Sequence, residues 1–160
     1  MKDAFKKVVY AVLTFEAKLL LRRTKPIVIA VTGSVGKTST KDAIFAVLKN
    51  HRKARKSEKS FNSEIGVPLS VLGLPNGWDN PVAWIINIIE GFFIAAFSRN
   101  YPEVLVLEAG VDRPGDMKSL TAWLKPDIAV ITRLPDVPVH VEYFSTPEAV
   151  AEEKLELVRA

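Results

Sequence analysis

One glycine-rich segment constrains the fold of this chain more than any other. Residues 31–40 read Val-Thr-Gly-Ser-Val-Gly-Lys-Thr-Ser-Thr and directly follow the apolar run 27–30. Glycines let the backbone adopt positive φ values and approach an anion closely, while the N-terminal end of a following helix attracts negative charge. A strand, a tight turn and a helix in this order are typical of a loop that binds the phosphates of a nucleoside triphosphate.

The residues of this loop have distinct expected roles. Backbone N–H groups of four residues are expected to point at phosphate oxygens: Gly33, Ser34, Val35 and Gly36. Lys37 adds positive charge near the β- and γ-phosphates, and the hydroxyl of Thr38 is available to Mg²⁺. Val31 stands where the longer form of the pattern has its first glycine, so an ordinary turn with a surface lysine is the alternative.

The composition favours one globular domain. Of the 160 residues, 48% are hydrophobic, which is enough to build one full core. Cysteine is absent, so disulfides and thiolate metal sites are excluded; with no signal-peptide pattern at Met1, this favours a reducing compartment, the cytoplasm by default. The most apolar segment, 82–97, is shorter than a membrane span and contains Asn87 and Glu90, which predicts a buried helix.

Residues 3–22 are predicted to form an amphipathic helix, taken as an N-terminal element of residues 1–23. The apolar residues fall on one side at helical spacing: Phe5, Val8, Val9, Val12, Leu13, Leu19 and Leu20. This helix could pack on the domain, contact a partner or lie on a membrane surface. Packing or a partner is favoured over the membrane, because Asp3 and Glu16 would be repelled by anionic lipids.

A basic cluster follows the first helix of the expected domain. It consists of Lys49, Arg52, Lys53, Arg55, Lys56 and Lys59, and it accounts for much of the formal net charge of +4. Such a cluster could attract nucleic acid or another anion. A solvated face is favoured, because no aromatic residues interleave to stack on bases.

Two further apolar runs, 104–107 and 128–131, are typical of strands covered on both faces of a parallel sheet. Helices are expected over 37–49 with Ile44, Val47 and Leu48 inward, within 62–72, over 115–124, and from Ser145 or Thr146 to the end. This order predicts an α/β fold: an open, mostly parallel sheet flanked by helices, with ligands at the carboxyl ends of its strands.

Three more side chains are candidates for chemistry at that edge. Glu108 follows a strand directly, so its carboxylate suits Mg²⁺, although it could instead cap a backbone N–H. His140 lies in the loop after 128–131 and could bind a metal or phosphate, or simply be a surface residue. Lys154 shares a helix side with Val150, Leu157 and Val158, and Glu152, Glu153 and Glu156 lie mostly away. A lysine that points inward needs a partner or a function. The alternative is that its aliphatic part is buried while its amine reaches solvent or forms an ion pair.

Taken together, five stretches in this order resemble the central ATP-binding domain of the Mur ligases: 32–41, 62–69, 107–110, 114–116 and 126–132. The resemblance covers about residues 24–160. The stretch Glu-Ile-Gly-Val-Pro within it favours the branch that adds D-alanyl-D-alanine to the peptidoglycan precursor. Folylpolyglutamate synthases and lipid II amidating enzymes, which share the ATP site, are the related alternatives.

The resemblance implies a set of site residues. The phosphate loop of the family maps onto Gly33, Gly36, Lys37, Thr38 and Ser39. The magnesium ligands map onto Thr38, Glu108 and His140, and the lysine that becomes carbamylated, and so resembles a carboxylate, maps onto Lys154. Asn62 and Ser63 occupy a stretch that contacts substrate in the family. Lys37, His140 and Lys154 are thus the expected catalytic residues, with ATP and Mg²⁺ as cofactors.

The reaction implied is amide formation through an acyl phosphate, with a UDP-linked muramyl peptide or a similar carboxylate as acceptor and an amino acid or dipeptide as amine. Mur ligases also carry a domain on either side of this one, which 160 residues do not accommodate. We therefore expect a truncated ligase, inactive alone, or a reduced homologue that needs a partner chain. A non-catalytic nucleotide-binding or scaffold module is the alternative from another class.

Overall fold

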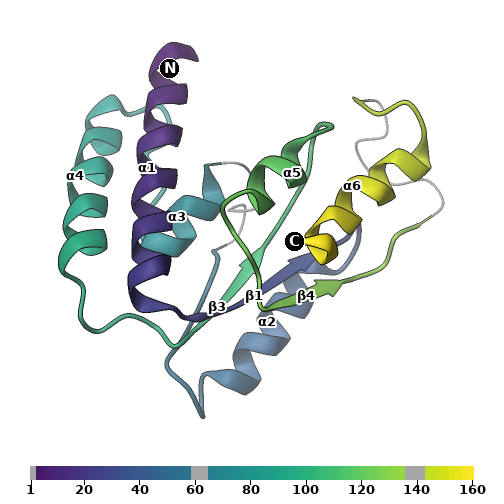
Figure 1. Ribbon diagram of the computed structural model, residues 1–160, viewed down its shortest axis with the longest axis horizontal. Helices are drawn as coiled ribbons and strands as arrows, with labels where there is room; N and C mark the ends of the chain where they lie inside the picture. Colours follow the sequence, from purple (N-terminus) through teal and green to yellow (C-terminus); the bar gives the residue numbers. More distant parts are fainter. Residues whose placement is uncertain (1–2, 59–64, 136–142) are drawn as a thin grey trace.

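A single parallel sheet organises the molecule. The computed structural model describes residues 3–58, 65–135 and 143–160. Within them, the strands are β1 (Ile27–Thr32), β2 (Ala54–Lys56), β3 (Val104–Glu108) and β4 (Ile128–Ile131). All pairings are parallel and the spatial order is β2-β3-β1-β4 (Figure 1). The predicted open α/β sheet is confirmed, and β1, which leads into the glycine-rich loop, is an inner strand.

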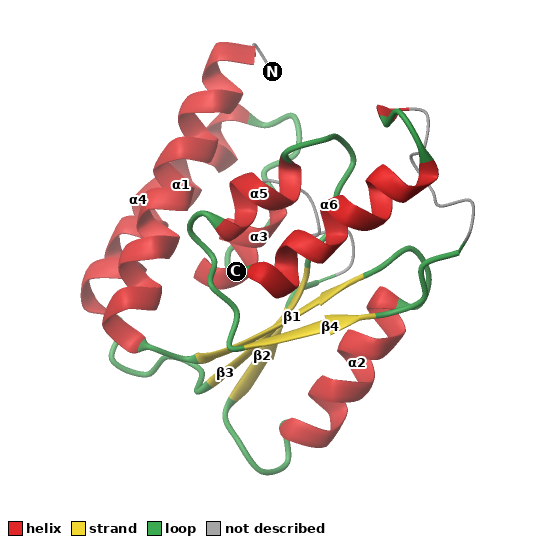
Figure 2. Ribbon diagram, turned by 45° about the vertical axis from the view of Figure 1, so that its right-hand side comes forward, coloured by secondary structure: helices red, strands yellow, loops and turns green. Residues whose placement is uncertain are grey.

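Helices cover both faces of this sheet. In the described residues they are α1 (Asp3–Thr24), α2 (Lys37–Leu48), α3 (Gly66–Leu72), α4 (Pro81–Phe97), α5 (Asp116–Thr121) and α6 (Pro147–Arg159). Figure 2 shows α2 on one face and the other helices on the opposite side. Helix α6 begins as its capping sequence predicts, because the side chain of Thr146 accepts a hydrogen bond from the N–H of Ala149 at 3.2 Å.

Alternation along the buried strands produces two cores. Ile29 and Val31 of β1 point toward α2, where they pack with Ile44, Phe45 and Leu48. Val28 and Ala30 point to the other face and join the larger core under α1, α3, α5 and α6. Because successive strand residues face opposite sides, a strand buried on both faces is apolar throughout, as the sequence of β1 is.

The register aligns the carboxyl ends of the two inner strands. Val31 of β1 lies opposite Glu108 of β3, so the end of β3 is level with the start of the glycine-rich loop. At the other end of the sheet, Asp127 accepts a hydrogen bond from the N–H of Val28 at 2.7 Å, which joins the start of β1 to the segment before β4. The sheet therefore presents its loops at one edge, as a parallel arrangement requires.

The structure corrects the predicted burial of several helices. Helix α4 is not a buried helix, because one side carries large apolar residues that are about half exposed or more. Val8 and Leu19 of α1 are exposed on a side that was expected to be buried, and so is Val47 of α2. Asn87 is buried, and its Nδ2 donates to the carbonyl of Pro75 at 2.8 Å. Among the described helices, none is long and apolar enough to cross a membrane.

The basic cluster is a solvated face in part: Lys49, Arg52 and Lys53 are exposed as predicted, Arg55 and Lys56 are half-buried, and Lys59 lies outside the described residues. Part of it is strand β2, which the sequence Ala-Arg-Lys does not indicate, because it contains no β-branched or aromatic residue. Arg55 is half-buried; its Nη1 donates to the carbonyl of Val71 at 3.0 Å and its guanidinium lies over the ring of Tyr101. Lys56 pairs with Asp42 at 2.8 Å. These cations have structural contacts with α2, α3 and the segment before β3.

Candidate functional site

The glycine-rich loop connects β1 to α2 in a conformation that requires glycine at two positions. Gly33 has φ of 137° and Gly36 has φ of 88°. A Cβ atom at Gly33 would lie 2.0 Å from Oγ1 of Thr132 and 3.1 Å from its backbone nitrogen. The first loop glycine is therefore required for its φ value and for the close approach of the segment after β4.

Hydrogen bonds hold the rest of this loop. The N–H groups of Ser34 and Val35 both donate to the carbonyl of Arg133, at 3.0 and 3.4 Å, so they do not point at an open phosphate site as expected. Helix α2 begins at Lys37. The N–H groups of its first turn have no acceptor within the helix, as at the start of any α-helix. Nζ of Lys37 donates to the carbonyl of Gly33 at 3.0 Å, which places its charge over the loop.

Thr38 and Glu108 meet directly behind the loop. The hydroxyl of Thr38 donates to Oε2 of Glu108 at 2.8 Å. Glu108 ends β3 and is only 5% exposed, and its backbone N–H donates to the hydroxyl of Ser57 at 3.0 Å. A hydroxyl and a carboxylate in contact, in the first turn of a helix and at the end of a strand, are the hard oxygen donors that Mg²⁺ prefers.

Lys154 reaches the same place from the last helix. It is 3% exposed, and its Nζ donates to the hydroxyl of Ser34 at 3.0 Å. Burial lowers the pKa of Lys154, and the positive charge of nearby Lys37 lowers it further. A lysine inward on α6 is thus brought to the phosphate loop, although 120 residues separate it from Ser34.

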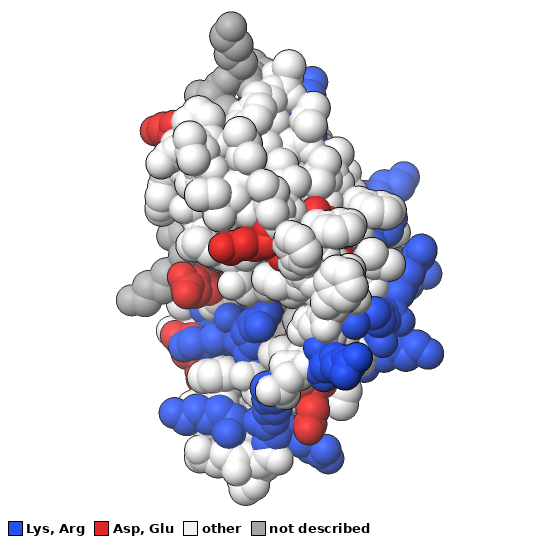
Figure 3. All heavy atoms as spheres, turned by 90° about the vertical axis from the view of Figure 1, so that its left-hand side faces the viewer, with Lys and Arg blue, Asp and Glu red and all other residues white. Residues whose placement is uncertain are grey.

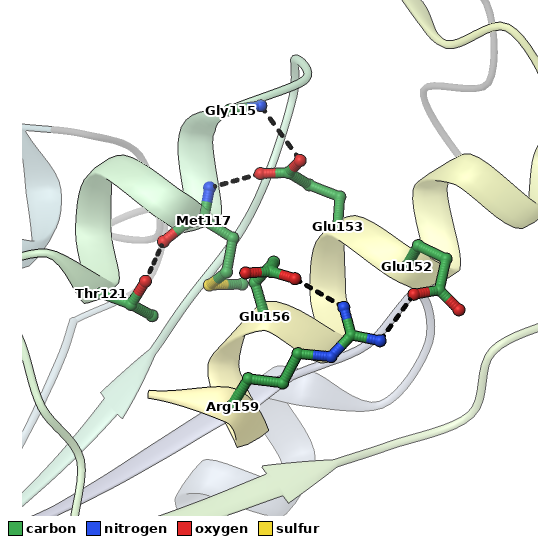
Figure 4. A network of polar contacts seen from close by, with 7 residues as sticks. All are labelled: Gly115, Met117, Thr121, Glu152, Glu153, Glu156 and Arg159. Carbon is green, nitrogen blue, oxygen red and sulfur yellow. Dashed lines mark hydrogen bonds and ion pairs between the residues drawn. The ribbon is translucent and has the colours of Figure 1, made fainter.

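Helix α6 is held in place by contacts with α5 (Figure 4). The carboxylate of Glu153 accepts hydrogen bonds from the N–H groups of Gly115, at 3.0 Å, and Met117, at 2.8 Å. These are N–H groups at the start of α5, where a negative charge is stabilising. The prediction that Glu153 points away from the domain is therefore wrong, and Val158, expected inward, is 57% exposed.

One buried cation near the site was not singled out from the sequence. Lys41 of α2 is 1% exposed, and its Nζ donates to the carbonyl of Ser57 at 2.8 Å and lies 3.5 Å from Asp42. A signal existed, because Lys41 shares the helical spacing of the inward residues Ile44 and Leu48. Since Ser57 also contacts Glu108, Lys41 connects α2 to the segment that supports this carboxylate.

Three predicted residues lie outside the part of the chain that the structure describes: His140, Asn62 and Ser63. Within the described residues, no group of three acidic or histidine side chains is placed to hold a metal ion. In the described part, the oxygen donors that could hold Mg²⁺ are those of Thr38 and Glu108, and the amine of Lys154 lies beside the loop at Ser34.

Comparison with known proteins decides the family. The model of the Mur ligase middle domain matches residues 31–83 and 91–160. The chain belongs to the Mur ligase family. This match includes the phosphate loop, Glu108 and Lys154, and it breaks off over 84–90, inside α4.

The relatives and solved structures agree with that family. The chain is 34% identical to the UDP-N-acetylmuramoyl-tripeptide--D-alanyl-D-alanine ligase of Bacillus subtilis and 32% identical to that of Borreliella burgdorferi. Each match extends over 142 residues and covers 89% of this chain and 25% of the relative. The crystal structure of MurF ligase from Thermotoga maritima in complex with ADP superposes with a TM-score of 0.68 at 28% identity, over 99% of this chain and 30% of that one.

A second MurF structure, from Acinetobacter baumannii, has a TM-score of 0.67 at 18% identity, over 94% of this chain and 27% of its own, and supports the fold. The Mur ligase chain described here spans about a quarter of the length of the curated relatives it matches.

Proposed function

We propose that this chain is the ATP-binding part of a MurF-like ligase of peptidoglycan precursor synthesis. One observation carries the proposal: in a chain that matches the Mur ligase middle domain, the hydroxyl of Thr38 contacts the carboxylate of Glu108 at 2.8 Å behind the phosphate loop. The ADP complex of the Thermotoga maritima relative supports a nucleotide at this place. The activity for which the relatives are named suggests a UDP-muramoyl tripeptide as acceptor and D-alanyl-D-alanine as amine.

The phosphates of ATP bind between the loop and the first turn of α2. The backbone of Gly33 to Gly36 lies close to the phosphates, and Ser39 lies in the first turn of α2. The ammonium group of Lys37 leaves the carbonyl of Gly33 and donates instead to the β- and γ-phosphates. The N–H groups of Ser34 and Val35 leave the carbonyl of Arg133 when they donate to phosphate. The loop thus changes from internal hydrogen bonds to hydrogen bonds with the nucleotide.

The oxygen donors of the site fit Mg²⁺. Thr38 and Glu108 would hold the ion, together with His140 and a carbamylated Lys154. The lowered pKa of Lys154 favours the neutral amine, which is the form that attacks CO₂. The new N–C bond would form as one C–O π bond of CO₂ opens, its electron pair going to the oxygen, and the nitrogen releases a proton to give the carbamate. When bound, Mg²⁺ supplies positive charge that stabilises the transferring phosphoryl group.

The reaction proceeds through an acyl phosphate. The γ-phosphoryl group of ATP passes to an oxygen of the acceptor carboxylate and ADP is formed. The nitrogen of the amine attacks the carbonyl carbon, the bond to the phosphate oxygen breaks, and amide, inorganic phosphate and a proton are released. Lys37 stabilises charge during the first step, and the remaining contribution is the positioning of the reactants.

The other parts of the proposal concern contacts outside this site. Residues 24–160 are assigned to the nucleotide-binding domain, and residues 1–23, which include most of helix α1 (Asp3–Thr24), to an N-terminal element that precedes it. Asn62 and Ser63 contact the acceptor, and the sites for UDP and for the amine are completed by further domains or by a partner chain. The protein acts in the cytoplasm, where ATP and the UDP-linked precursor are available.

Titration of Mg-ATP into the wild-type chain and into Thr38→Val tests the metal site by calorimetry. Valine keeps the shape of threonine and removes the hydroxyl, so the dependence of ATP affinity on Mg²⁺ is expected to be lost while the protein stays folded. Ser119→Ala, on α5, is the control. Equal Mg²⁺ dependence in Thr38→Val contradicts the metal site.

The reaction itself is tested by ADP release from the protein together with its remaining domains or partner chain. Release is expected to require both a UDP-muramoyl tripeptide and D-alanyl-D-alanine. Hydrolysis that is indifferent to both contradicts a ligase and favours a non-catalytic nucleotide-binding module.

A further inference from the structure

Helices α1 and α4, which pack against each other, both expose large apolar side chains to solvent. Six of them lie on one side of α4 and are 48% to 66% exposed: Ile85, Ile86, Ile89, Phe92, Phe93 and Phe97. Three lie at helical spacing on α1, where Val8 is 58%, Phe15 67% and Leu19 41% exposed. We call these nine residues the apolar face. Monomeric soluble domains rarely expose an apolar patch of this extent without a partner.

Packing of α4 does not account for the apolar face. The opposite side of α4 is buried, through Trp84, Asn87, Gly91 and Ala95. Arg23 of α1 donates to the carbonyls of Ile94 and Ser98 at the end of α4, at 3.2 and 2.7 Å, which fixes the helix by its last turn. Since this helix is already anchored, the isoleucines and phenylalanines on its outer side contribute little to the fold.

A basic stripe borders the apolar face. On α1, Lys7, Lys18 and Arg22 lie at helical spacing on the side next to that of Val8, Phe15 and Leu19, and Lys25 follows directly after the helix. Figure 3, which views the molecule from the α4 side, shows an upper area nearly free of charged side chains and lysines and arginines gathered along its border and below. Lys18, Arg22, Lys25 and Lys125 also line a cavity of about 390 Å³ beside Trp123.

Two acidic residues of α1 and α4 have side chains that the structure describes, Glu16 and Glu90. Glu16, expected to oppose an anionic membrane, is 4% exposed and faces α4, because a Cβ atom on Gly91 would lie 2.2 Å from its Oε2. The one ionisable residue of α4 is Glu90. The argument that Glu16 repels lipids therefore does not hold in the folded chain.

We propose that the apolar face docks on the surface of an anionic lipid bilayer, with α4 and α1 lying in the plane of the interface. Isoleucine and phenylalanine side chains insert at the level of the acyl chains, and the basic stripe contacts lipid phosphates. A second copy of the chain fits less well, because its own apolar face offers only Glu90 on α4 to the four cations of the stripe.

Vesicle flotation of the full chain tests the proposal. We expect the chain to float with vesicles of phosphatidylcholine and phosphatidylglycerol, to bind vesicles of phosphatidylcholine alone more weakly, and to lose much of this difference in high salt. The double variant Phe92→Ser, Phe93→Ser is expected to bind the mixed vesicles roughly tenfold or more weakly, because two phenyl rings no longer insert. The control Val47→Ser changes an apolar residue on α2 that is even more exposed, and it is expected to bind as the wild type does.

A second pair of variants separates charge from insertion. Arg22→Glu is expected to weaken binding to the mixed vesicles only, while Lys49→Glu, at the end of α2, leaves it unchanged. Circular dichroism and thermal melting show whether each variant is folded. Absence of flotation by a folded wild-type chain overturns the proposal. It is also overturned by a dimer in light scattering that dissociates in the Phe92→Ser, Phe93→Ser variant while vesicles are not bound; that result assigns the apolar face to a second copy.

Discussion

Two regions of the molecule depart from the rule that apolar side chains are buried and charged side chains are exposed. The phosphate edge of the sheet buries charged side chains, and the pair of helices α1 and α4 exposes apolar ones. At the edge, polar and charged side chains are buried: Glu108 is 5% and Lys154 3% exposed, and each has a hydrogen-bonded partner. On the helix pair, phenylalanines such as Phe93 and Phe97 are 57% and 66% exposed. These phenylalanine rings contact one another along α4. Buried polar groups with specific partners indicate a binding site, and exposed apolar groups indicate a contact surface.

The largest expected effect concerns the backbone of the phosphate edge. Gly33→Ala places a Cβ atom 2.0 Å from Oγ1 of Thr132 at a φ of 137°, and the backbone nitrogen of Thr132 at 3.1 Å prevents relief by rotation of the hydroxyl alone. We expect a loss of about 4 kcal/mol in the free energy of unfolding, from backbone strain and steric overlap together.

Gly36→Ala is the matched control in the same loop, measured like Gly33→Ala by urea denaturation. Its φ is 88°, but nothing lies within 4 Å of the added Cβ atom. Only backbone strain of about 1 kcal/mol is expected. Equal losses in the two variants would show that contact with the segment after β4 does not determine the loop.

The next effect concerns the ligand at the phosphate edge. Lys37→Ala removes the ammonium group that lies 3.0 Å from the carbonyl of Gly33, over the loop. We expect the dissociation constant for Mg-ATP to rise roughly a hundredfold, equivalent to about 3 kcal/mol, in calorimetry. Lys49→Ala, at the far end of α2, is expected to leave it unchanged. Unaltered binding by Lys37→Ala contradicts the assignment of the phosphate loop.

Much of the phosphate edge could be predicted because its signals are local in sequence. The segment 33–38 specifies its own turn, and Glu108 ends an apolar run, so the sequence alone predicts the place of both without knowledge of the packing. Ser57 and the carbonyl of Arg133 could not be predicted, since their contacts depend on which strands become neighbours. The short strand β2, which brings Ser57 next to Glu108, has no apolar pattern of its own.

The buried acid of the helix pair gives an effect that depends on pH. Burial raises the pKa of Glu16 from 4.5 to about 7, and its Oε2 has no hydrogen-bond partner among the described residues. The folded chain binds this proton more tightly than the unfolded chain, so stability falls as the pH rises from about 4.5 to about 7 and stays lower above that range.

Glu16→Gln removes this dependence. The variant is expected to be about 2–3 kcal/mol more stable than the wild type above pH 7 and to lose that advantage near pH 4.5, in melts across the range. Glu90→Gln, at an exposed position, is the control. An unchanged difference between Glu16→Gln and wild type at all pH values would show that Glu16 does not titrate within the fold.

The smallest effect is expected on the apolar face itself. Phe93→Ser should change the free energy of unfolding by less than about 1 kcal/mol, because the ring is already 57% exposed. Leu13→Ala, at a fully buried position of α1, should cost about 2–5 kcal/mol in the same urea denaturation experiment. Similar losses would mean that the apolar face stabilises the fold and is not reserved for a contact.

The sequence alone determined the strand, loop and helix of the phosphate site. It also determined the parallel sheet and the capped last helix, which carries Lys154. These features depend on residues close together in the chain, where spacing and turn chemistry act directly. Only the tertiary structure decided that Lys154 contacts Ser34, that Glu16 is hidden between α1 and α4, and that the most apolar helix turns one side to solvent. The reason is physical: periodicity defines the sides of a helix, but which side is covered depends on neighbours supplied by distant segments.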